Sequence, residues 1–268
     1  MATIRPFMAI RPAFNYADKV AALPYDVMNS EEAREMVKDK PWSFLHVDKA
    51  EVDLPVGTDI YSDEVYEKAK DNLLNMIGHG VIGQDLLPNL YIYRLTMNGK
   101  SQTGLVCCTS VDEYINGTIK KHELTRADKE ADRIRHVDTL NANTGPIFLA
   151  YRDNPDARAI IDGWATMKKP EYDFVAEDGI RHTVWVMDSD MEIGMLVQAF
   201  PSTENFYIAD GHHRNASAVK VALKRREENP DYTGEEEFNF YLSVLFPADE
   251  LYIMDYNRVV KDLNGYDA

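Results

Sequence analysis

One feature constrains the possible structure of this chain more than any other: a short apolar run that leads directly into the start of a helix. Phe206–Ala209 is typical of a buried strand, and Gly211–Glu228 favours a long helix. The first turn of a helix leaves backbone N–H groups unpaired and carries roughly half a positive charge. The junction at Asp210–Arg214 therefore predicts a strand, a turn and a helix N-terminus that holds a phosphate group.

The side chains of this junction suit an anion. Gly211 lets a phosphate approach the backbone closely, Arg214 offers a planar bidentate fork, and His212 and His213 add donors. One alternative is that Asp210 caps the helix and pairs with Arg214 while the histidines fill an interface. A carboxylate beside phosphates is repulsive unless it caps the helix or binds a bridging Mg²⁺, so Asp210 is also the candidate metal ligand.

A second cluster, Lys120–Arg126, opens the most basic stretch of the chain. The run before it resembles a strand, so we expect Glu123 in a loop between a strand and a helix, where catalytic carboxylates are common. Held ionised by Lys121 and His122, Glu123 could remove a proton from a hydroxyl as a general base. The alternative is a helix surface laced with ion pairs, which applies most to the basic residues that continue to His136.

The helix expected at residues 125–140 has the pattern of a charged surface helix. Thr125, with Asp128 three residues further on, is typical of a helix start. Ile134, Val137 and Leu140 form an apolar stripe on one side.

The charge balance excludes several classes of partner. The chain of 268 residues has 29 basic and 45 acidic side chains, a net charge of −16, so its long-range field repels DNA, RNA and anionic membranes. No run approaches the roughly 20 apolar residues of a spanning helix, and the N-terminus lacks the apolar core of a signal peptide. We therefore expect a cytoplasmic protein that binds neither nucleic acid nor membrane. The adjacent Cys107 and Cys108 suit neither a disulfide framework nor a metal site, and we expect both to be buried.

Strand and helix signals mix without a regular β-α-β period, which favours an α+β fold with mixed sheets. Turns at 98–99 and 178–179, each between two β-rich runs, predict two hairpins. The expected helices cover residues 63–77, 125–140, 156–167, 190–200 and 211–228, with a further helix start at 29–32. The expected strands cover residues 90–97, 104–109, 172–176, 182–187, 206–209, 238–246 and 251–254. Prolines between residues 4 and 28 favour extended segments and turns there.

Three other motifs fail on their context. Residues 78–83 match the glycine spacing of a dinucleotide-binding turn, but a helix enters where that motif needs a strand. Residues 99–101 resemble the end of a phosphate-binding P-loop, yet they lie in a hairpin turn. The pair His122-Glu123 begins like a zinc protease helix, but Arg126 stands where the second histidine would be.

Six segments resemble the family called domain of unknown function 1015, and they span nearly the whole chain. They are Ile4–Phe7, Leu23–Val27, Lys120–Glu123, Thr125–Glu130, Asp178–His182 and Ile208–Arg214. That family in turn resembles the ParB-like superfamily, in which free serine kinase and sulfiredoxin bind nucleotide phosphates with an equivalent strand, turn and helix. Free serine kinase has an Asp-Gly-His-His-Arg of its own, preceded by a Lys-Pro-His-Glu whose glutamate is the catalytic base.

The resemblance implies a ParB/sulfiredoxin-like nucleotide-binding core at residues 111–268 and an added N-terminal α/β portion at residues 1–110, or one compact unit. It implies that Glu123 is the catalytic base, with His122 and Asp210 also catalytic and Asp210 on the metal. The residues implied to bind the nucleotide are Gly211, His212, His213, Arg214, Lys121 and Arg126.

The activity implied by the resemblance is phosphoryl transfer from ATP or ADP, with Mg²⁺, to a small hydroxyl metabolite such as L-serine. The alternative from another class is a non-catalytic nucleotide-binding switch. The sequence differs from the kinase in having Lys121 in place of a proline and a longer gap between the two motifs. Family members usually continue past Tyr256–Val260 into a Pro-Lys-Ser/Thr-Thr motif, whereas this sequence ends at Ala268. We therefore expect either a shortened piece of a longer protein or a natural short form.

Overall fold

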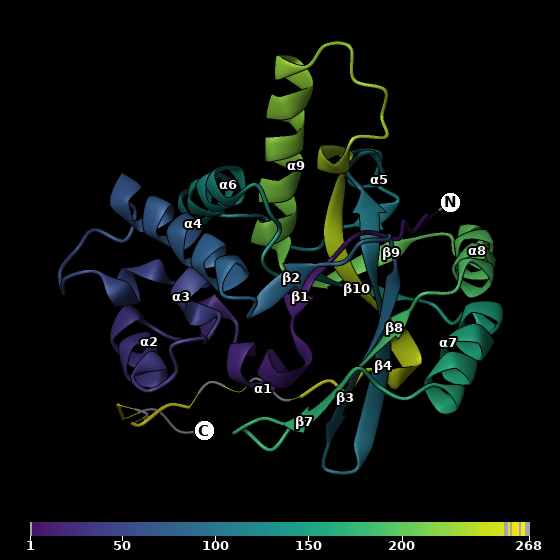
Figure 1. The fold of residues 1–268 in the computed structure, drawn as a ribbon, viewed down its shortest axis with the longest axis horizontal. Coiled ribbons are helices and arrows are strands. Elements are labelled where there is room, and N and C mark those ends of the chain that lie inside the picture. Colours follow the sequence, from purple (N-terminus) through teal and green to yellow (C-terminus); the bar gives the residue numbers. More distant parts are fainter. Residues whose placement is uncertain (1, 255–256, 258, 263, 266–268) are drawn as a thin grey trace.

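A computed structural model describes residues 2–254, 257, 259–262 and 264–265, and of Asp128 it describes the backbone alone. Tyr256 and Arg258, which belong to the family-like segment near the end of the chain, lie outside the described residues. Within the described residues the fold mixes helices with one large sheet, as the α+β expectation requires (Figure 1).

An eight-stranded mixed sheet organises the molecule, in the order β5-β9-β6-β10-β4-β3-β8-β7. Its strands are β3 (Leu90–Met97), β4 (Lys100–Ser110), β5 (Ile119–Lys120), β6 (Ile147–Tyr151), β7 (Tyr172–Val175), β8 (Arg181–Met187), β9 (Phe206–Asp210) and β10 (Phe240–Pro247). Only β5 with β9 and β6 with β10 pair in parallel. A separate pair, β1 (Ile10–Pro12) and β2 (Ile82–Gln84), is antiparallel.

Helices cover both faces of the sheet. Figure 1 shows α7 and α8 on one side of it and α2, α3, α4 and α6 on the other. The α-helices are α1 (Ala17–Val20), α2 (Ser30–Val37), α3 (Leu45–Asp48), α4 (Asp63–Gly78), α5 (Val111–Ile115), α6 (Ala127–Leu140), α7 (Pro155–Met167), α8 (Asp190–Ala199) and α9 (His212–Glu228).

The main core lies between the sheet and the helices α7 and α8. Leu105, Ile92 and Trp185 from neighbouring strands join Trp164 of α7 and Leu196 of α8 in one buried cluster. Side chains alternate across a strand, so the residues between these, such as Tyr93 and Cys108, face the opposite side of the sheet. A second, smaller core joins α3, α4 and α6 on that opposite side.

Local sequence rules predicted much of this framework correctly. Both hairpins are confirmed, with Asn98 and Gly99 at positive φ in the first turn and Gly179 at positive φ in the second. The helix start at Asn29 is confirmed as a full capping box with Glu32. The glycine-spaced segment from residue 78 to 83 runs from the end of α4 into β2, the opposite of a dinucleotide-binding turn. Cys107 and Cys108 are free and buried, as expected.

The N-terminal stretch is more regular than expected. Arg5 and Phe7 form isolated bridges, β1 follows them, and a short helix occupies Ala17–Val20 between two single turns of 3-10 helix. At the other end, residues 251–254 form no strand, so the expected pairing with β10 is wrong. Pro247 ends β10 and cannot donate to a ladder, and the chain continues as the 3-10 turn Ala248–Glu250.

The expectation for the helix at 125–140 needs correction in two respects. The helix α6 begins at Ala127, with Arg126 as its N-cap, and Thr125 bonds Glu130 instead. The buried stripe contains Glu130, Arg133, His136 and Leu140, while Ile134 and Val137 are only half buried. The helix is therefore not a simple surface helix, because Glu130 pairs with Lys220 of α9, His136 bonds Val47 of α3 and Arg133 lies over the ring of Tyr25.

Candidate functional site

Two parallel strands bring the two sequence motifs together. In the pairing of β5 with β9, Ile119 lies opposite Phe206 and Lys120 opposite Tyr207. Parallel strands end at the same edge of a sheet, so the loop after β5 and the turn after β9 leave the sheet side by side. The loop carries Glu123, and the turn leads into α9.

The start of α9 leaves its backbone donors open. Gly211 is the N-cap residue, with φ 88° in the left-handed region that glycine tolerates best. Among the described residues no side chain caps this helix, and its first turn has no acidic residue. The expected alternative in which Asp210 caps the helix is therefore wrong. N–H groups at such a terminus attract an anion through hydrogen bonds and the helix dipole.

Three residues of the two motifs meet at this terminus. The rings of His122 and His212 lie edge to face with centroids 4.4 Å apart. Nδ1 of His212 is 3.5 Å from Oε2 of Glu123, an ion-pair distance that is long for a hydrogen bond. The Glu123 side chain is 59% exposed, whereas that of His212 is 5% exposed. The carboxylate is thus open to solvent beside a buried imidazole, and it lies in a loop, as the sequence predicts.

The surroundings of the buried imidazole favour its neutral form. Burial lowers the pKa of His212, and the neighbouring His122 lowers it further, against the opposing effect of Glu123. Nε2 of His212 and Nδ1 of His213 are buried and have no hydrogen-bond partner among the described residues. Buried polar atoms in native proteins are nearly always paired, so each of these nitrogens calls for a partner beyond the described side chains, such as water or a ligand.

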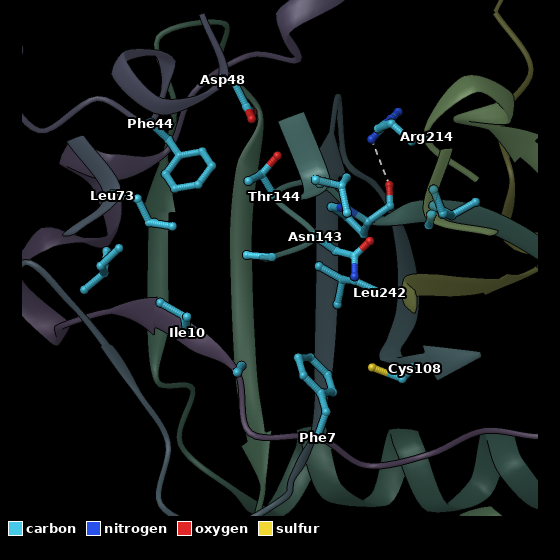
Figure 2. Close-up of a pocket in the computed structure, with 18 of the residues that line it drawn as sticks. Phe7, Ile10, Phe44, Asp48, Leu73, Cys108, Asn143, Thr144, Arg214 and Leu242 are labelled. Atoms are coloured by element: carbon cyan, nitrogen blue, oxygen red, sulfur yellow. Dashed lines mark hydrogen bonds between the residues drawn. The ribbon is translucent and has the colours of Figure 1, made fainter. Parts of the chain in front are cut away.

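Arg214 is fixed by two hydrogen bonds and two glycines. Nη2 donates to Oδ2 of Asp210 at 2.6 Å, and Nη1 donates to the carbonyl oxygen of Pro146 at 2.8 Å. Figure 2 draws one hydrogen bond of this guanidinium group as a dashed line. A Cβ atom added at Gly145 would lie 3.1 Å from Nη1, and one added at Gly211 would lie 3.3 Å from the guanidinium carbon. The guanidinium group therefore packs closely against both glycines, and a side chain at either position would require it to shift by a few tenths of an ångström. The expected pairing of Asp210 with Arg214 is present.

Two of the expected nucleotide-binding residues lie elsewhere around the loop. The ammonium group of Lys121 lies 4.1 Å from the ring centroid of Tyr114 on α5. Arg126 is the exposed N-cap residue of α6, and its carbonyl oxygen accepts from the backbone N–H of Glu130. Neither position brings its charge to the start of α9 through a described contact.

A network of polar side chains connects the loop that carries Glu123 to the first turns of α9. Glu130 accepts a hydrogen bond from Thr125 at 2.7 Å and forms an ion pair with Lys220. The hydroxyl of Ser217 donates to the carbonyl oxygens of His213 and Glu130 at 2.7 and 3.2 Å. These contacts join α6 to the first turns of α9, so the loop that carries Glu123 is anchored directly after the site.

A cleft of about 780 Å³ opens beside this terminus. Arg214 lines the cleft, whereas Glu123, His122 and His212 do not. The cleft lies between the sheet and the N-terminal helices, and Figure 2 shows residues from both sides around it. Its polar residues include Asp48, Arg133, His136 and Thr144, which come from α3, α6 and the loop before β6.

The sequence pointed to only some of these residues. Arg133 and His136 belong to the basic stretch that the sequence singled out, but the structure buries them to 8% and 3% exposure. No motif marked Asp48, which lies in a four-residue helix. The one signal for the loop before β6 was its turn-forming composition at residues 141–146, which does not indicate a ligand.

Two kinds of feature are absent from the part of the chain that the structure describes. No group of three or more His, Cys, Asp or Glu side chains there could hold a metal ion by itself. No helix among those residues combines the length and the apolar composition that crossing a bilayer requires.

Comparison with known proteins gives one match. The family model described as "Protein of unknown function (DUF1015)" matches residues 4–268. Searches of curated proteins and of solved structures find no significant match. Since the family model covers nearly all of the sequence, including both motifs at the start of α9, the chain belongs to the DUF1015 family.

Proposed function

We propose that this protein binds a nucleotide, ATP or ADP, at the start of α9 and transfers a phosphoryl group to a small hydroxyl metabolite, with L-serine as the first candidate. One observation carries the proposal. The buried His212 at the start of α9 lies against His122 and Glu123, two residues from a distant part of the sequence. This contact supports the proposal because Glu123, the residue we propose as the base, then lies near open N–H donors and an unpartnered imidazole nitrogen.

The proposed reaction needs one base and several donors. The carboxylate of Glu123 accepts the proton of the substrate hydroxyl, and that oxygen forms a bond to the terminal phosphorus of the nucleotide. The bond from this phosphorus to the bridging oxygen breaks, and the shortened nucleotide leaves with the electron pair. The N–H groups at the start of α9 and Arg214 offset the negative charge of the transferred group, and the histidines offer it hydrogen bonds.

A magnesium ion is part of the proposal because phosphoryl transfer commonly requires one. Asp210 offers an exposed carboxylate directly before α9, although it already forms an ion pair with Arg214. One carboxylate is sufficient for this kind of site, because Mg²⁺ keeps several waters and is usually bound through one or two carboxylates plus the phosphates of the substrate. The ion would neutralise phosphate charge that Asp210 alone would repel.

The first test separates binding from turnover. Glu123→Gln removes the charge of the base and keeps its shape, so we expect nucleotide affinity to stay nearly constant. Phosphoryl transfer should fall about a hundredfold or more, the usual contribution of a positioned acid or base. The assay uses a panel of free hydroxyl amino acids with ATP and with ADP, and calorimetry for nucleotide affinity.

Glu227→Gln is the matched control. It makes the same substitution near the far end of the same helix, on the order of 22 Å from His212 at 1.5 Å per residue. Its activity should equal that of the unsubstituted protein. If Glu123→Gln and Glu227→Gln behave alike, Glu123 is not the base, and its role is then limited to surface ion pairs of at most about 1 kcal/mol.

One contact favours the alternative of a nucleotide-dependent switch. Arg214 joins the turn before α9 to the loop before β6, through Asp210 and the carbonyl of Pro146. A phosphate that competes for this guanidinium would loosen that loop, which is how a bound nucleotide alters a distant surface. If the protein binds nucleotide but phosphorylates no member of the panel, the switch becomes the better explanation.

A further inference from the structure

The large cleft has a charged end and an aromatic end, which is unusual for a gap between two packed halves. Its volume of about 780 Å³ lies in the upper part of the range of roughly 300–1,000 Å³ that is typical of small-molecule sites. Free serine would fill little of this space. The cleft is also lined mainly by apolar side chains, as ligand sites commonly are.

The charged end is formed by two arginines that act on the same two neighbours. Both Arg133 and Arg214 lie within electrostatic range of the Asp48 carboxyl and the Tyr25 hydroxyl. Arg133 is 8% exposed, and its guanidinium carbon lies 4.2 Å from the ring centroid of Tyr25. Arginines in this position provide planar donors that suit a carboxylate, sulfonate or phosphate.

Asp48 adds an unsatisfied group at this end. Burial raises the pKa of Asp48, although His136, a hydrogen bond with Thr144 and the two arginines all act in the other direction. Its Oδ1 atom is buried and has no hydrogen-bond partner among the described residues. A buried carboxyl oxygen without a partner is destabilising, so it calls for a group beyond the described side chains. The raised pKa favours the protonated carboxyl, which donates a hydrogen bond to an anion where the carboxylate would repel it.

The aromatic end lies on the sheet. The ring of His182 stacks between those of Tyr93 and Phe174, at centroid distances of 5.9 and 5.3 Å. The hydroxyl of Tyr93 lies 2.6 Å from Nδ1 of His182, which fixes the orientation of the ring. All three side chains line the cleft, on the face of the sheet opposite to the main core.

An apolar floor connects the two ends. Leu242 of β10 lies opposite Cys108 of β4 in the sheet, and both side chains line the cleft. Figure 2 shows Leu242 and Cys108 on one side of the cleft and Leu73 and Phe44 on the other. The wall between the arginines and the aromatic stack is therefore suited to an extended apolar body.

We propose that the cleft binds an elongated small molecule with an aromatic body and one anionic group, the anion at Arg133 and Arg214 and the body along Leu242 toward Phe174. Two sources share this chemistry. One is the nucleoside half of the nucleotide itself, and the other is an aromatic carboxylate that acts as acceptor or effector. The nucleoside source rests on the proposed function and the aromatic carboxylate does not, and binding of either is measured without turnover.

The test measures binding of three probes by calorimetry: adenosine monophosphate, biphenyl-4-carboxylate and inorganic pyrophosphate. We expect one of the two aromatic probes to bind with one-to-one stoichiometry. Leu242→Trp fills the floor of the cleft and should weaken that binding at least tenfold. The matched control Met167→Trp adds the same ring at an exposed position on α7 and should change nothing.

The results of these measurements distinguish the two sources of the ligand, and they separate the cleft proposal from the proposed phosphoryl transfer. Binding of adenosine monophosphate that is lost in Leu242→Trp identifies the nucleoside, and the same result with biphenyl-4-carboxylate identifies a separate ligand. Pyrophosphate should bind equally to Leu242→Trp, since its site is the start of α9. If pyrophosphate does not bind while an aromatic probe does, the proposed function fails and the cleft site stands.

Folding of the variant is checked by its unfolding temperature, and Leu242→Glu provides a second variant that puts a charge in the apolar floor with little added volume. A crystal structure of the unsubstituted protein with the tighter aromatic probe requires no variant. A probe seen in the cleft supports the proposal. Binding elsewhere, equal affinity in both Leu242 variants, or no binding of either aromatic probe overturns it.

Discussion

Gly145 lies so close to Arg214 that replacing it tests how the guanidinium group is held. The missing side chain would place its Cβ 3.1 Å from Nη1 and 3.6 Å from Cδ of Arg214. The first distance is shorter than an ordinary van der Waals contact, so in Gly145→Ala the guanidinium must shift. That shift weakens the hydrogen bond of 2.8 Å to Pro146, which lies next to the substituted residue.

The expected cost follows from the bond that is strained. A hydrogen bond to a charged group contributes about 1.5–3 kcal/mol, and partial loss of one should lower the free energy of unfolding by about 1–2 kcal/mol. With Arg214→Ala already present, no described atom beyond the two neighbouring residues lies within 4 Å of the new methyl group. Gly145 does not have a positive φ, so alanine is then expected to be neutral or to stabilise by about 0.4–1 kcal/mol through the unfolded state.

The assay is a double-mutant cycle with urea denaturation of the unsubstituted protein, Gly145→Ala, Arg214→Ala and the double variant. We expect a coupling free energy of about 1–3 kcal/mol between the two positions, because independent sites add to within about 0.5 kcal/mol. Gly163→Ala on α7 is the control, since its Cβ would meet no atom within 4 Å. Additive effects of Gly145→Ala and Arg214→Ala would refute the close packing on which the site description depends.

Three further predictions concern single groups. Burial lowers the pKa of His136 and His212, so the unfolded chain takes up these protons at a higher pH than the folded protein does. The free energy of unfolding should therefore drop between about pH 7 and 5, and denaturation curves of His136→Asn should show a smaller drop. Asn29→Ala removes the capping box of α2 and should lower the free energy of unfolding by about 1 kcal/mol in the same assay. Asp210→Asn releases Arg214 from its ion pair, so this variant should bind pyrophosphate more tightly than the unsubstituted protein when Mg²⁺ is absent. If Asp210 binds the metal, the variant should bind pyrophosphate more weakly when Mg²⁺ is present. Calorimetry that shows no change under either condition would remove Asp210 from the site.

The sequence predicted several of the turns and helix starts, because these depend on residues that are neighbours along the chain. The turn at Asn98 requires positive φ and is found there, and the strand that ends at Asp210 does lead into a helix whose N-cap is Gly211. The meeting of this helix with Glu123 was implied only by resemblance, because nothing in the spacing of the two motifs shows that β5 and β9 are neighbours. That pairing is a property of the whole sheet.

The cleft could not be predicted because its polar residues are buried for reasons that only tertiary packing reveals. His136 has the spacing of a surface residue beside other charged side chains, yet its Nε2 atom lies 3.1 Å from the carbonyl oxygen of Val47 in the interior. Asp48 follows Val47 in a helix of one turn, too short for any periodicity to show which side faces inward. Such positions are decided by contacts between segments that are distant in sequence.

Arg214 connects the two sites by its position. Its described hydrogen bonds to Asp210 and Pro146 engage two of the five N–H donors of a guanidinium group. Its charge also acts on Asp48 and Tyr25 at the charged end of the cleft. A phosphate at the start of α9 and an anion in the cleft would therefore both bind to the guanidinium group of Arg214. If the phosphate and the anion belong to one molecule, both contacts strengthen the binding of that molecule. If they belong to two molecules, each molecule must weaken the binding of the other by the same factor, because coupling between two binding sites is reciprocal.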